Sequence, residues 1–416
     1  MIRHDKPIIT SLSDIDFYKF AMGKMIHRKH PNASVTLSFL NRTKSVPLAR
    51  VIDMDRLWQE LQHCRTLRFT PQELHYLMGT YEYFQPMFSI DYIHFLKDLR
   101  LPEFSLGEID GQLDLQFFGN WAEVTYWETL AMSIVDQLYG EHLTQDFSRF
   151  ELQCLEAEGV IRLEKKVRCL NAHQDITFSD FGTRRRFSQK WQDRIVEILV
   201  EECGDRFKGT SNVALADKYG ITPVGTNAHE LPMVYSGIFW REDDKNPMYS
   251  HRQVLKDWED EYGLGLSIFL PDTVSSDWFF KNVVNREQLR QWKGSRQDSG
   301  NPLQYANDRI IEYKANRIDP LSKLIVFADG QNVQSMMQIS EALHGKIGYT
   351  FGWGTDLTND VGFDPISIVV KATQANGHPV AKLSDNIAKA TGPKEAVDRM
   401  KRLVNYDVTF SEECKS

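Results

Sequence analysis

The sequence has few cysteines and no long apolar run. Its five cysteines are isolated along the chain, odd in number and without a Cys-x-x-Cys pair; they are Cys64, Cys154, Cys169, Cys203 and Cys414. A disulfide framework or a zinc cluster is therefore not expected, and reduced cytosolic thiols are the better interpretation. No apolar stretch approaches the roughly 20 residues of a membrane-spanning helix, and the polar amino-terminus lacks the apolar segment of a signal peptide. These absences predict a cytoplasmic protein that does not contact a membrane.

Basic residues are not in excess either. The chain carries 57 acidic and 49 basic residues, a formal net charge of −8, so general affinity for nucleic acid is not expected. An anionic ligand must then be attracted by a local basic cluster. With 416 residues, of which 42% are hydrophobic, the chain is long enough for two domains, each with its own core.

Several familiar motifs are also missing. There is no Walker A lysine pattern, and the late Gly352-Trp353-Gly354 lacks the third glycine of a dinucleotide fingerprint. His229-Glu230 begins like a zinc protease helix, but a second histidine is absent and Pro232 breaks the pattern. The metalloprotease class is therefore rejected, and neither of these two nucleotide-binding motifs is available to support a function.

The first 150 residues alternate between helical and strand-like patterns. Residues 13–30 show helical spacing behind a candidate N-cap at Ser13-Asp14, and Val35 to Leu40 alternates as a strand does. The remaining elements expected in this region are helices over 51–100 broken at Thr70-Pro71 and Gln85-Pro86, short strands over 104–118, and a long helix over 121–150.

From about residue 160 the sequence pattern changes. Short runs of apolar or small residues now end in polar loops, and each loop is followed by a stretch with helical spacing. The seven runs are Ile176 to Phe181, Phe207, Ile221 to Val224, Leu266 to Leu270, Trp292-Lys293, Leu324 to Ala328, and Tyr349 to Gly352. This succession predicts a βα array, and polar residues directly after the strands suit a (β/α) barrel whose site lies at the carboxyl ends of the strands.

The carboxyl-terminal tail is expected to form a hairpin, Ile366 to Val370 and Val380 to Leu383, across Asn376-Gly377, followed by a helix from Pro393. We expect both to pack against the amino-terminal region. The predicted fold is α/β: an irregular (β/α) barrel-like catalytic domain over 151–364, and an α+β domain over 1–150 that is completed by 365–416.

Four stretches carry the residue types that bind anions. Phe181-Gly182-Thr183-Arg184 continues into two more arginines, which favours phosphate binding beside a planar ring, although a solvated charge run is the simpler interpretation of this motif alone. Arg296-Gln297-Asp298 lies in a predicted polar turn that contains glycine and can bind an anion and a diol. An ordinary polar turn without a ligand is an equally good interpretation of this spacing. Asp329-Gly330 and the Gly352–Thr355 loop offer backbone N–H groups to a phosphate.

His229 follows one of the predicted strands and precedes Glu230, a carboxylate that can orient an imidazole. A lone histidine after a strand is more often structural than catalytic. Its place in a barrel-type loop nevertheless makes it the candidate reactive group.

Taken in order, these motifs resemble the nicotinate phosphoribosyltransferase family within the type II phosphoribosyltransferases. The resemblance covers essentially the whole chain. It runs through Asp16-Phe17-Tyr18-Lys19, Phe181-Gly182-Thr183-Arg184, Gly209-Thr210-Ser211-Asn212, His229-Glu230, Arg296-Gln297-Asp298-Ser299-Gly300, Asp329-Gly330 and Gly352-Trp353-Gly354-Thr355. Unrelated barrels have no reason to carry all seven in sequence.

The resemblance implies that the ring nitrogen of nicotinate attacks C1 of phosphoribosyl pyrophosphate, with Mg²⁺ assisting and with ATP hydrolysis coupled through a phosphohistidine, as an ATP-dependent, ligase-type enzyme of NAD biosynthesis. It also implies roles for particular residues. Phe181 and Tyr18 (often from a neighbouring subunit) would lie on the two faces of the nicotinate ring, with Arg296 and Ser211 at its carboxylate. Arg184 would bind donor phosphate oxygens, Asp298 the ribose hydroxyls, and His229 would be the phosphorylated residue. The 5′-phosphate would be bound by Asp329, Gly330, Gly352, Gly354 and Thr355, and less supported site residues are Asp16, Arg42, Glu230, Lys371 and Lys382.

One position departs from the family pattern, since Asn301 stands where the motif ends in aspartate, so no role is carried over to it. The protein ligands of Mg²⁺ stay open, as does the choice between monomer and homodimer. Two alternatives also stay open. A nicotinamide phosphoribosyltransferase would share the fold, but Ser211 rather than an acidic acceptor favours a carboxylate ligand. A catalytically inactive phosphosugar or nucleotide sensor is disfavoured by His229 and the Arg296–Asp298 pair.

Overall fold

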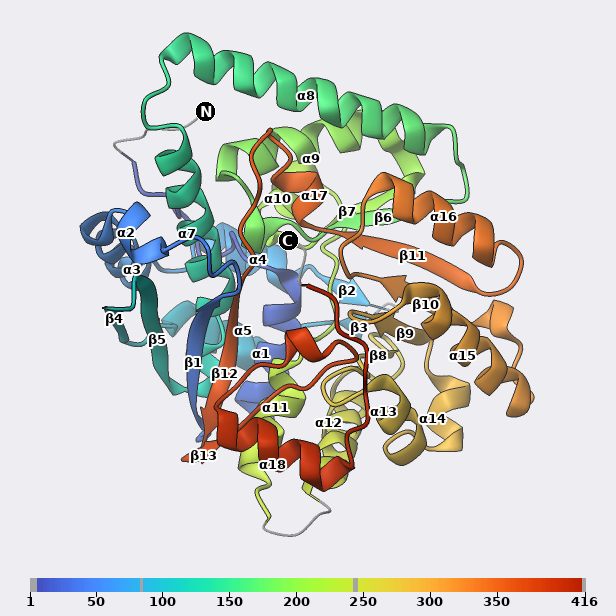
Figure 1. Ribbon diagram of the computed structural model, residues 1–416. Helices are drawn as coiled ribbons and strands as arrows, with labels where there is room; N and C mark the ends of the chain where they lie inside the picture. Colours follow the sequence, from blue (N-terminus) through green and yellow to red (C-terminus); the bar gives the residue numbers. More distant parts are fainter. Residues whose placement is uncertain (1–5, 83–84, 242–245, 414–416) are drawn as a thin grey trace.

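The computed structural model describes residues 6–82, 85–241 and 246–413 (Figure 1). Residues 1–5, on which most of the expected polar amino-terminus falls, and Cys414 lie outside the described residues. Cys64, Cys154, Cys169 and Cys203 are free thiols. Among the described residues, no helix combines the length and the apolar character needed to cross a membrane. The fold is mixed α/β and contains two main sheets, one antiparallel and one parallel.

The antiparallel sheet joins the two ends of the chain. Its strand order is β13 (His378–Pro379), β12 (Ile368–Ala375), β1 (Ser34–Asn41), β5 (Gln112–Asn120) and β4 (Phe104–Ile109). Strand β1 pairs with β12, with Leu37 opposite Ala372, and the two strands lie side by side in Figure 1. The tail turn at Asn376-Gly377 is confirmed, and both turn residues have positive φ as a tight hairpin turn requires. The second strand is His378–Pro379, directly after the turn, and not Val380 to Leu383 as expected; there only Lys382 forms a bridge, to Thr391.

The parallel sheet carries the carboxyl-terminal half of the chain. Its strand order is β7 (Phe207–Thr210), β6 (Phe178–Asp180), β11 (Gly348–Trp353), β10 (Leu324–Phe327), β9 (Gly294–Gln297) and β8 (Ile268–Phe269). The βα array is confirmed, but the described strands form no closed barrel, since β7 and β8 stand at the two ends of the order. The predicted strand at Ile221 to Val224 is reduced to one bridge between Thr210 and Pro223.

Helices fill the rest of the fold. In the first half they are α1 (Phe17–Lys29), α2 (Leu48–Val51), α3 (Met54–Thr66), α4 (Pro71–Met78), α5 (Ile90–Asp98), α6 (Trp121–Val124), α7 (Trp127–Leu143) and α8 (Arg149–Asn171). In the second half they are α9 (Gln189–Cys203), α10 (Val213–Tyr219), α11 (Glu230–Ile238), α12 (Asn246–Tyr262), α13 (Ser276–Asn282), α14 (Arg286–Gln291), α15 (Pro302–Ala315), α16 (Val333–Leu343), α17 (Thr355–Thr358) and α18 (Lys394–Val404). Short 3₁₀ turns are η1 (Thr183–Arg185), η2 (Gly204–Arg206), η3 (Pro320–Ser322) and η4 (Ile387–Lys389), and β2 (Tyr81–Glu82) pairs with β3 (Gln85–Pro86).

Several boundaries in the first half differ from expectation. The N-cap of α1 is Asp16 rather than Ser13-Asp14, because the Asp14 carboxylate is taken by Arg186. The long helix expected over 121–150 is divided into α6 and α7, and Gln85-Pro86 forms a short strand rather than a mere helix break.

The region near residue 160 was expected to begin the βα array. It lies instead within α8, a helix of 23 residues that begins at a Ser148–Glu151 capping box and packs on α9. Figure 1 shows α8 lying along the outside of the molecule beside α9. A helix forms here instead of a strand because its apolar residues recur at helical spacing. They form one narrow buried stripe that includes Leu155, Leu163 and Leu170.

The tail helix α18 forms as predicted, directly after Pro393. It was expected to pack on the amino-terminal region but lies against α12 instead. Its Met400 also clusters with Val274 and Leu383, which lie outside α12. The hairpin does join the amino-terminal sheet through β12. The domain boundaries at 150 and 365 stay predictions, since one continuous hydrophobic core includes residues of both sheets, such as Leu37 and Phe327.

Candidate functional site

The polar residues singled out in the sequence lie where the parallel strands end. Phe181, Ser211 and Asp298 directly follow β6, β7 and β9, and Asp329 and Thr355 follow β10 and β11 after one intervening residue. Because parallel strands end at a common edge, these residues share one side of the sheet. Arg296 itself lies within β9, not in the polar turn where the sequence placed it.

His229 lies at this edge, directly before α11, and is almost fully buried. Its Nδ1 is 2.9 Å from Oγ1 of Thr273, and its Nε2 is 3.0 Å from Oδ2 of Asp298 and 3.3 Å from Oδ1 of Asp272. A carboxylate only accepts hydrogen bonds, so in the neutral ring Nε2 carries the proton and Nδ1 accepts from Thr273. The lone pair of the imidazole is therefore on Nδ1.

The electrostatic setting keeps this imidazole neutral. Burial, aided by Lys382, lowers the pKa of His229 to about 4, against the opposing effect of Asp272 and Asp298. The pKa of Asp298 stays well below its usual range despite burial, because Arg296, His229 and Lys389 lie nearby. An uncharged imidazole between ionised carboxylates is a nucleophile at neutral pH.

Basic residues enclose the acidic side of His229. Lys382 Nζ lies 3.0 Å from Oδ2 of Asp272, which also accepts from Ser299 at 2.7 Å. Arg296 donates to the backbone oxygen of Asn227 at 2.9 Å and lies 3.5 Å from Oδ2 of Asp298. Lys389 donates to the carboxylate of Asp329 and to the backbone oxygen of Asp298.

The same residues fit a divalent cation. Ligand atoms of His229, Asp272 and Asp298 lie within 4.8 Å of one another, and Asp272 Oδ1 makes no hydrogen bond although it is buried. Mg²⁺ takes oxygen ligands and commonly uses one or two carboxylates together with substrate phosphates. Asp272 and Asp298 suit that role better than the imidazole does.

A second cluster of charges lies on the other side of Glu230. Lys19 Nζ lies 2.6 Å from Oε2 of Glu230 and 2.7 Å from Oε2 of Glu128, and Lys19 is fully buried. The other oxygen of Glu230 accepts from Trp121 and Thr125, each at 2.7 Å. Glu230 was expected to orient the imidazole, but its carboxylate points into this cluster because three donors converge there. Thr273, Asp272 and Asp298 orient His229 instead.

Four further residues complete this cluster: Asp16, Tyr18, Arg184 and Lys371. Together with Lys19, Glu128 and Glu230 they form what we call the Lys19 network. Arg184 Nε is 3.1 Å from Oδ2 of Asp16, and its guanidinium lies 5.4 Å from the ring centre of Tyr18. Lys371 Nζ is 3.0 Å from Oε1 of Glu128, and the Tyr18 hydroxyl donates to Oε2 of the same carboxylate at 3.2 Å.

This network changes what the sequence implied for three residues. Arg184 was expected at donor phosphate oxygens, yet it is engaged by Asp16 and by Glu128 at 3.6 Å. Ser211 donates its hydroxyl proton to Oδ1 of Asp16 at 2.6 Å, so it reaches a ligand only by giving up that bond. Lys371, expected with less support as a site residue, also pairs with Glu128.

The other predicted residues are spread around the edge of the parallel sheet. Phe181 lies against Gly352, where an added Cβ would come within 3.3 Å of its ring. Gly330 has φ +57° and open space where a side chain would lie, which suits a backbone approach to a phosphate. Gly354 is the N-cap of α17, which begins at Thr355. Arg42 reaches the tail, where it donates to Lys389 O at 3.1 Å and to Thr391 at 3.0 Å.

Sequence reasoning missed Asp272 and Thr273, although they directly follow the apolar run Leu266 to Leu270, and this position was the available signal. It also missed Glu128. That residue lies inside a helix among aromatic and apolar neighbours, and no sequence pattern indicates that Lys19, Tyr18, Arg184 and Lys371 converge on it.

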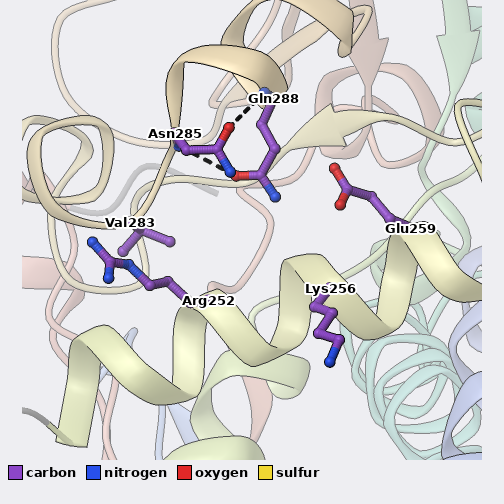
Figure 2. Close-up of a pocket in the computed structure, with 6 residues that line it drawn as sticks. All are labelled: Arg252, Lys256, Glu259, Val283, Asn285 and Gln288. Carbon is purple, nitrogen blue, oxygen red and sulfur yellow. Dashed lines mark hydrogen bonds between the residues drawn. The ribbon is translucent and has the colours of Figure 1, made fainter.

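A surface crevice of about 430 Å³ lies elsewhere, beside α12. It is lined by Arg252, Lys256, Glu259, Val283, Asn285 and Gln288 (Figure 2). Asn285 and Gln288 are committed to the capping box of α14, with Gln288 N donating to Asn285 Oδ1 at 2.9 Å. Arg252 donates to the backbone oxygen of Asn282. None of the sequence-predicted site residues lines this crevice, and we assign it no role.

The fold and the edge residues define an α/β protein whose site gathers anion-binding cations around a neutral histidine. Comparison with known proteins agrees with this description. The family model "nicotinate phosphoribosyltransferase (NAPRTase) family" matches residues 176–408, and the model of the N-terminal domain of that family matches residues 14–136.

Solved structures show the same likeness. A nicotinate phosphoribosyltransferase from Porphyromonas gingivalis is 29% identical, with a TM-score of 0.83 over 96% of this chain and 100% of that one. One from Vibrio cholerae is 28% identical, with a TM-score of 0.85 over 97% and 95% of the two chains. A putative one from Saccharomyces cerevisiae is 28% identical, with a TM-score of 0.85 over 97% and 100%. The chain is an enzyme of the nicotinate phosphoribosyltransferase family.

Proposed function

We propose that the chain forms nicotinate mononucleotide and pyrophosphate from nicotinate and 5-phosphoribosyl 1-pyrophosphate, and that it couples this reaction to ATP hydrolysis through a phosphohistidine at His229. The reaction belongs to NAD biosynthesis. The family match supports the transferase reaction. The observation that carries the coupling is the buried, neutral imidazole of His229, fixed between Thr273 and two carboxylates.

The histidine step follows from the proton positions. Nδ1 attacks the γ-phosphorus of ATP, the bond from that phosphorus to the β,γ-bridging oxygen breaks, and ADP leaves with the bond electrons. The Thr273 hydroxyl must first release Nδ1, while the Nε2 proton stays directed at Asp298. The two carboxylates stabilise the cationic ring that forms during the attack. Water later cleaves the N–P bond.

The transfer step needs positioning more than acid–base groups. The ring nitrogen of nicotinate attacks C1, and the bond from C1 to the pyrophosphate oxygen breaks. We assign Phe181 and Tyr18 to the ring, Arg296 to the carboxylate, Asp298 to the ribose hydroxyls, and the Gly330 and Gly352–Thr355 backbone to the 5′-phosphate. Lys382 and Arg42 are assigned to the phosphates. Mg²⁺, held by Asp272 and Asp298, would neutralise charge on the leaving pyrophosphate.

Pyrophosphate release tests the reaction directly. We expect release with nicotinate and phosphoribosyl pyrophosphate, faster with ATP, and at least about a hundredfold lower kcat/KM with nicotinamide, because an amide leaves buried donors unpaired. Equal use of nicotinamide would point to the amide-specific enzyme on the same fold. Binding of phosphoribosyl pyrophosphate without any turnover would point to a sensor.

Labelling with γ-labelled ATP tests the histidine. The wild type should gain acid-labile phosphate, and His229→Ala should gain none while keeping slow ATP-independent turnover. Glu230→Gln is the matched comparison, since its carboxylate points away from the imidazole, and we expect it to be labelled. Equal labelling of wild type and His229→Ala would place the phosphate elsewhere.

A further inference from the structure

Three consecutive arginines follow Phe181-Gly182-Thr183, and the fold gives each a different environment. Arg186 is fully buried and binds both oxygens of Asp14 at 2.6 Å, so it is structural. Arg184 is held by Asp16 and Glu128 in the Lys19 network. Within the described part of the chain, the guanidinium of Arg185 makes neither a hydrogen bond nor an ion pair. Only its backbone is bonded: its N–H donates to the oxygen of Gly182 at 3.0 Å, and its oxygen accepts from Asn359 at 2.9 Å.

The surroundings of Arg185 are those of an anion site. The guanidinium is partly buried, in η1 at the carboxyl edge of the parallel sheet, within electrostatic range of Arg184, Arg42 and Asp298. Burial and the charges of Arg184 and Arg42 lower the pKa of Arg185 to about 10. Two other guanidinium groups therefore act on Arg185 in a partly buried setting, and like charges held near one another cost free energy that a bound anion would offset.

A neighbouring carboxylate does not relieve this repulsion. Asp136 on α7 is buried, and neither of its oxygens has a hydrogen-bond partner in the structure. Burial raises the pKa of Asp136 well above its usual range, with Arg185 opposing, so the side chain resists ionisation. Asp136 therefore does not supply Arg185 with a full counter-charge.

We propose that Arg185 binds a polyphosphate, namely the pyrophosphate group of the phosphoribosyl donor, together with Arg42. The proposal rests on the proposed function. It transfers the anion-binding role in this motif from Arg184, whose charge is matched inside the protein, to Arg185, whose charge is not. A planar guanidinium with unused N–H donors matches phosphate oxygens in pairs. ATP offers the same chemistry through its terminal phosphates, and the experiment distinguishes the two sources.

The test compares Arg185→Gln with Arg185→Lys and with Lys190→Gln, which removes an exposed charge five residues away. Inorganic pyrophosphate binding, measured by calorimetry with Mg²⁺, should weaken about tenfold or more in Arg185→Gln, partly recover in Arg185→Lys, and stay unchanged in Lys190→Gln. The KM for phosphoribosyl pyrophosphate should rise by a similar factor, with the KM values for nicotinate and ATP within about threefold of wild type.

Three outcomes would overturn the proposal: unchanged pyrophosphate binding, a shift confined to ATP, or an equal rise for nicotinate, which would indicate a general distortion. The proposed function fails separately, through absence of turnover in the wild type. Pyrophosphate binding can be measured even in that case, so the two failures are distinguishable.

Discussion

The Lys19 network and the group around His229 use nearly the same residue types for different ends. Each combines lysines and arginine with carboxylates, and the two groups are joined in sequence by the peptide bond between His229 and Glu230. In the Lys19 network, Lys19, Asp16 and Glu128 are at most 2% exposed, and Glu128 accepts from two lysines and a tyrosine. Around His229, side chains of Asp298 and Asp329 are 28% and 29% exposed, and Asp272 Oδ1 is left without a hydrogen bond.

The difference shows that the pairing of the charges, rather than the residue types present, distinguishes a stabilising network from a site that can bind a ligand. Buried charges that satisfy one another fix the positions of Tyr18 and Arg184 and are costly to disturb. Charges left partly open and incompletely paired are available to a ligand. The following predictions test this contrast, from the largest expected effect to the smallest.

Removing Lys19, the central cation of the Lys19 network, should cause the largest loss of folding stability. Lys19→Met leaves Glu128 and Glu230 buried without their shared partner, so the free energy of unfolding should fall by about 3–5 kcal/mol in urea titrations. Lys218→Met breaks an exposed pair with Asp193 and should cost less than about 1 kcal/mol. Similar losses in both variants would remove the distinction between the network and a surface ion pair.

Removing a cation beside His229 should act on substrate binding rather than on folding. Arg296→Ala deletes a charge-assisted contact of about 1.5–3 kcal/mol, so the nicotinate KM should rise by about one to two orders of magnitude, with little change for phosphoribosyl pyrophosphate. Arg286→Ala, at an exposed position on α14, serves as the control. An unchanged nicotinate KM in Arg296→Ala would place the carboxylate contact elsewhere.

His251 provides an imidazole buried without carboxylates. Burial lowers its pKa from 6.5 to about 4, and its Nε2 has no hydrogen-bond partner. As pH falls below 6.5, the unfolded chain takes up the proton before the folded one, so stability is lost between pH 6.5 and 4. Of this loss, about 2 kcal/mol should occur between pH 6.5 and 5.

His251→Phe should flatten this dependence, which urea titrations at pH 7 and pH 5 can measure. Its absolute stability at pH 7 serves as the reference for any change in packing. A pH dependence that matches wild type would show that other groups cause the acid sensitivity.

The smallest effect is expected at Ser211, which is bonded to Asp16 of the Lys19 network. Because its hydroxyl donates to Asp16 in the structure, Ser211→Ala should raise the nicotinate KM by no more than about threefold. Steady-state kinetics with Thr210→Ser as a mild neighbouring change would check this. A tenfold rise would show that the hydroxyl leaves Asp16 and contacts nicotinate directly.

Much of the fold was accessible from local patterns. The tail hairpin followed from Asn376-Gly377 between alternating runs, and the βα array followed from apolar runs that end in polar loops, since a turn dipeptide or a buried strand is a short-range signal. The predicted ends of helices and strands were wrong where a residue interacts with a partner far away in the sequence. Asp14 lost its capping role to an arginine 172 positions away, and Ile221 to Val224 found no second strand to extend its ladder.

The sequence by itself determined the chemical inventory: the histidine after a predicted strand, the arginine and aspartate of Arg296-Gln297-Asp298, the triple arginine, and the glycines of the late loops. Only the tertiary structure decided which of these groups stay open to a ligand. In the folded chain Glu230 points away from His229 toward Lys19, and Asp272 and Thr273 contact the imidazole. The three adjacent arginines differ in their surroundings: Arg186 is buried, Arg184 is paired, and the Arg185 guanidinium has no bonded partner among the described residues. Sequence position could not show this, because the strength of a charge–charge interaction depends on distance through space and on exclusion of water, and both arise only when remote segments pack together.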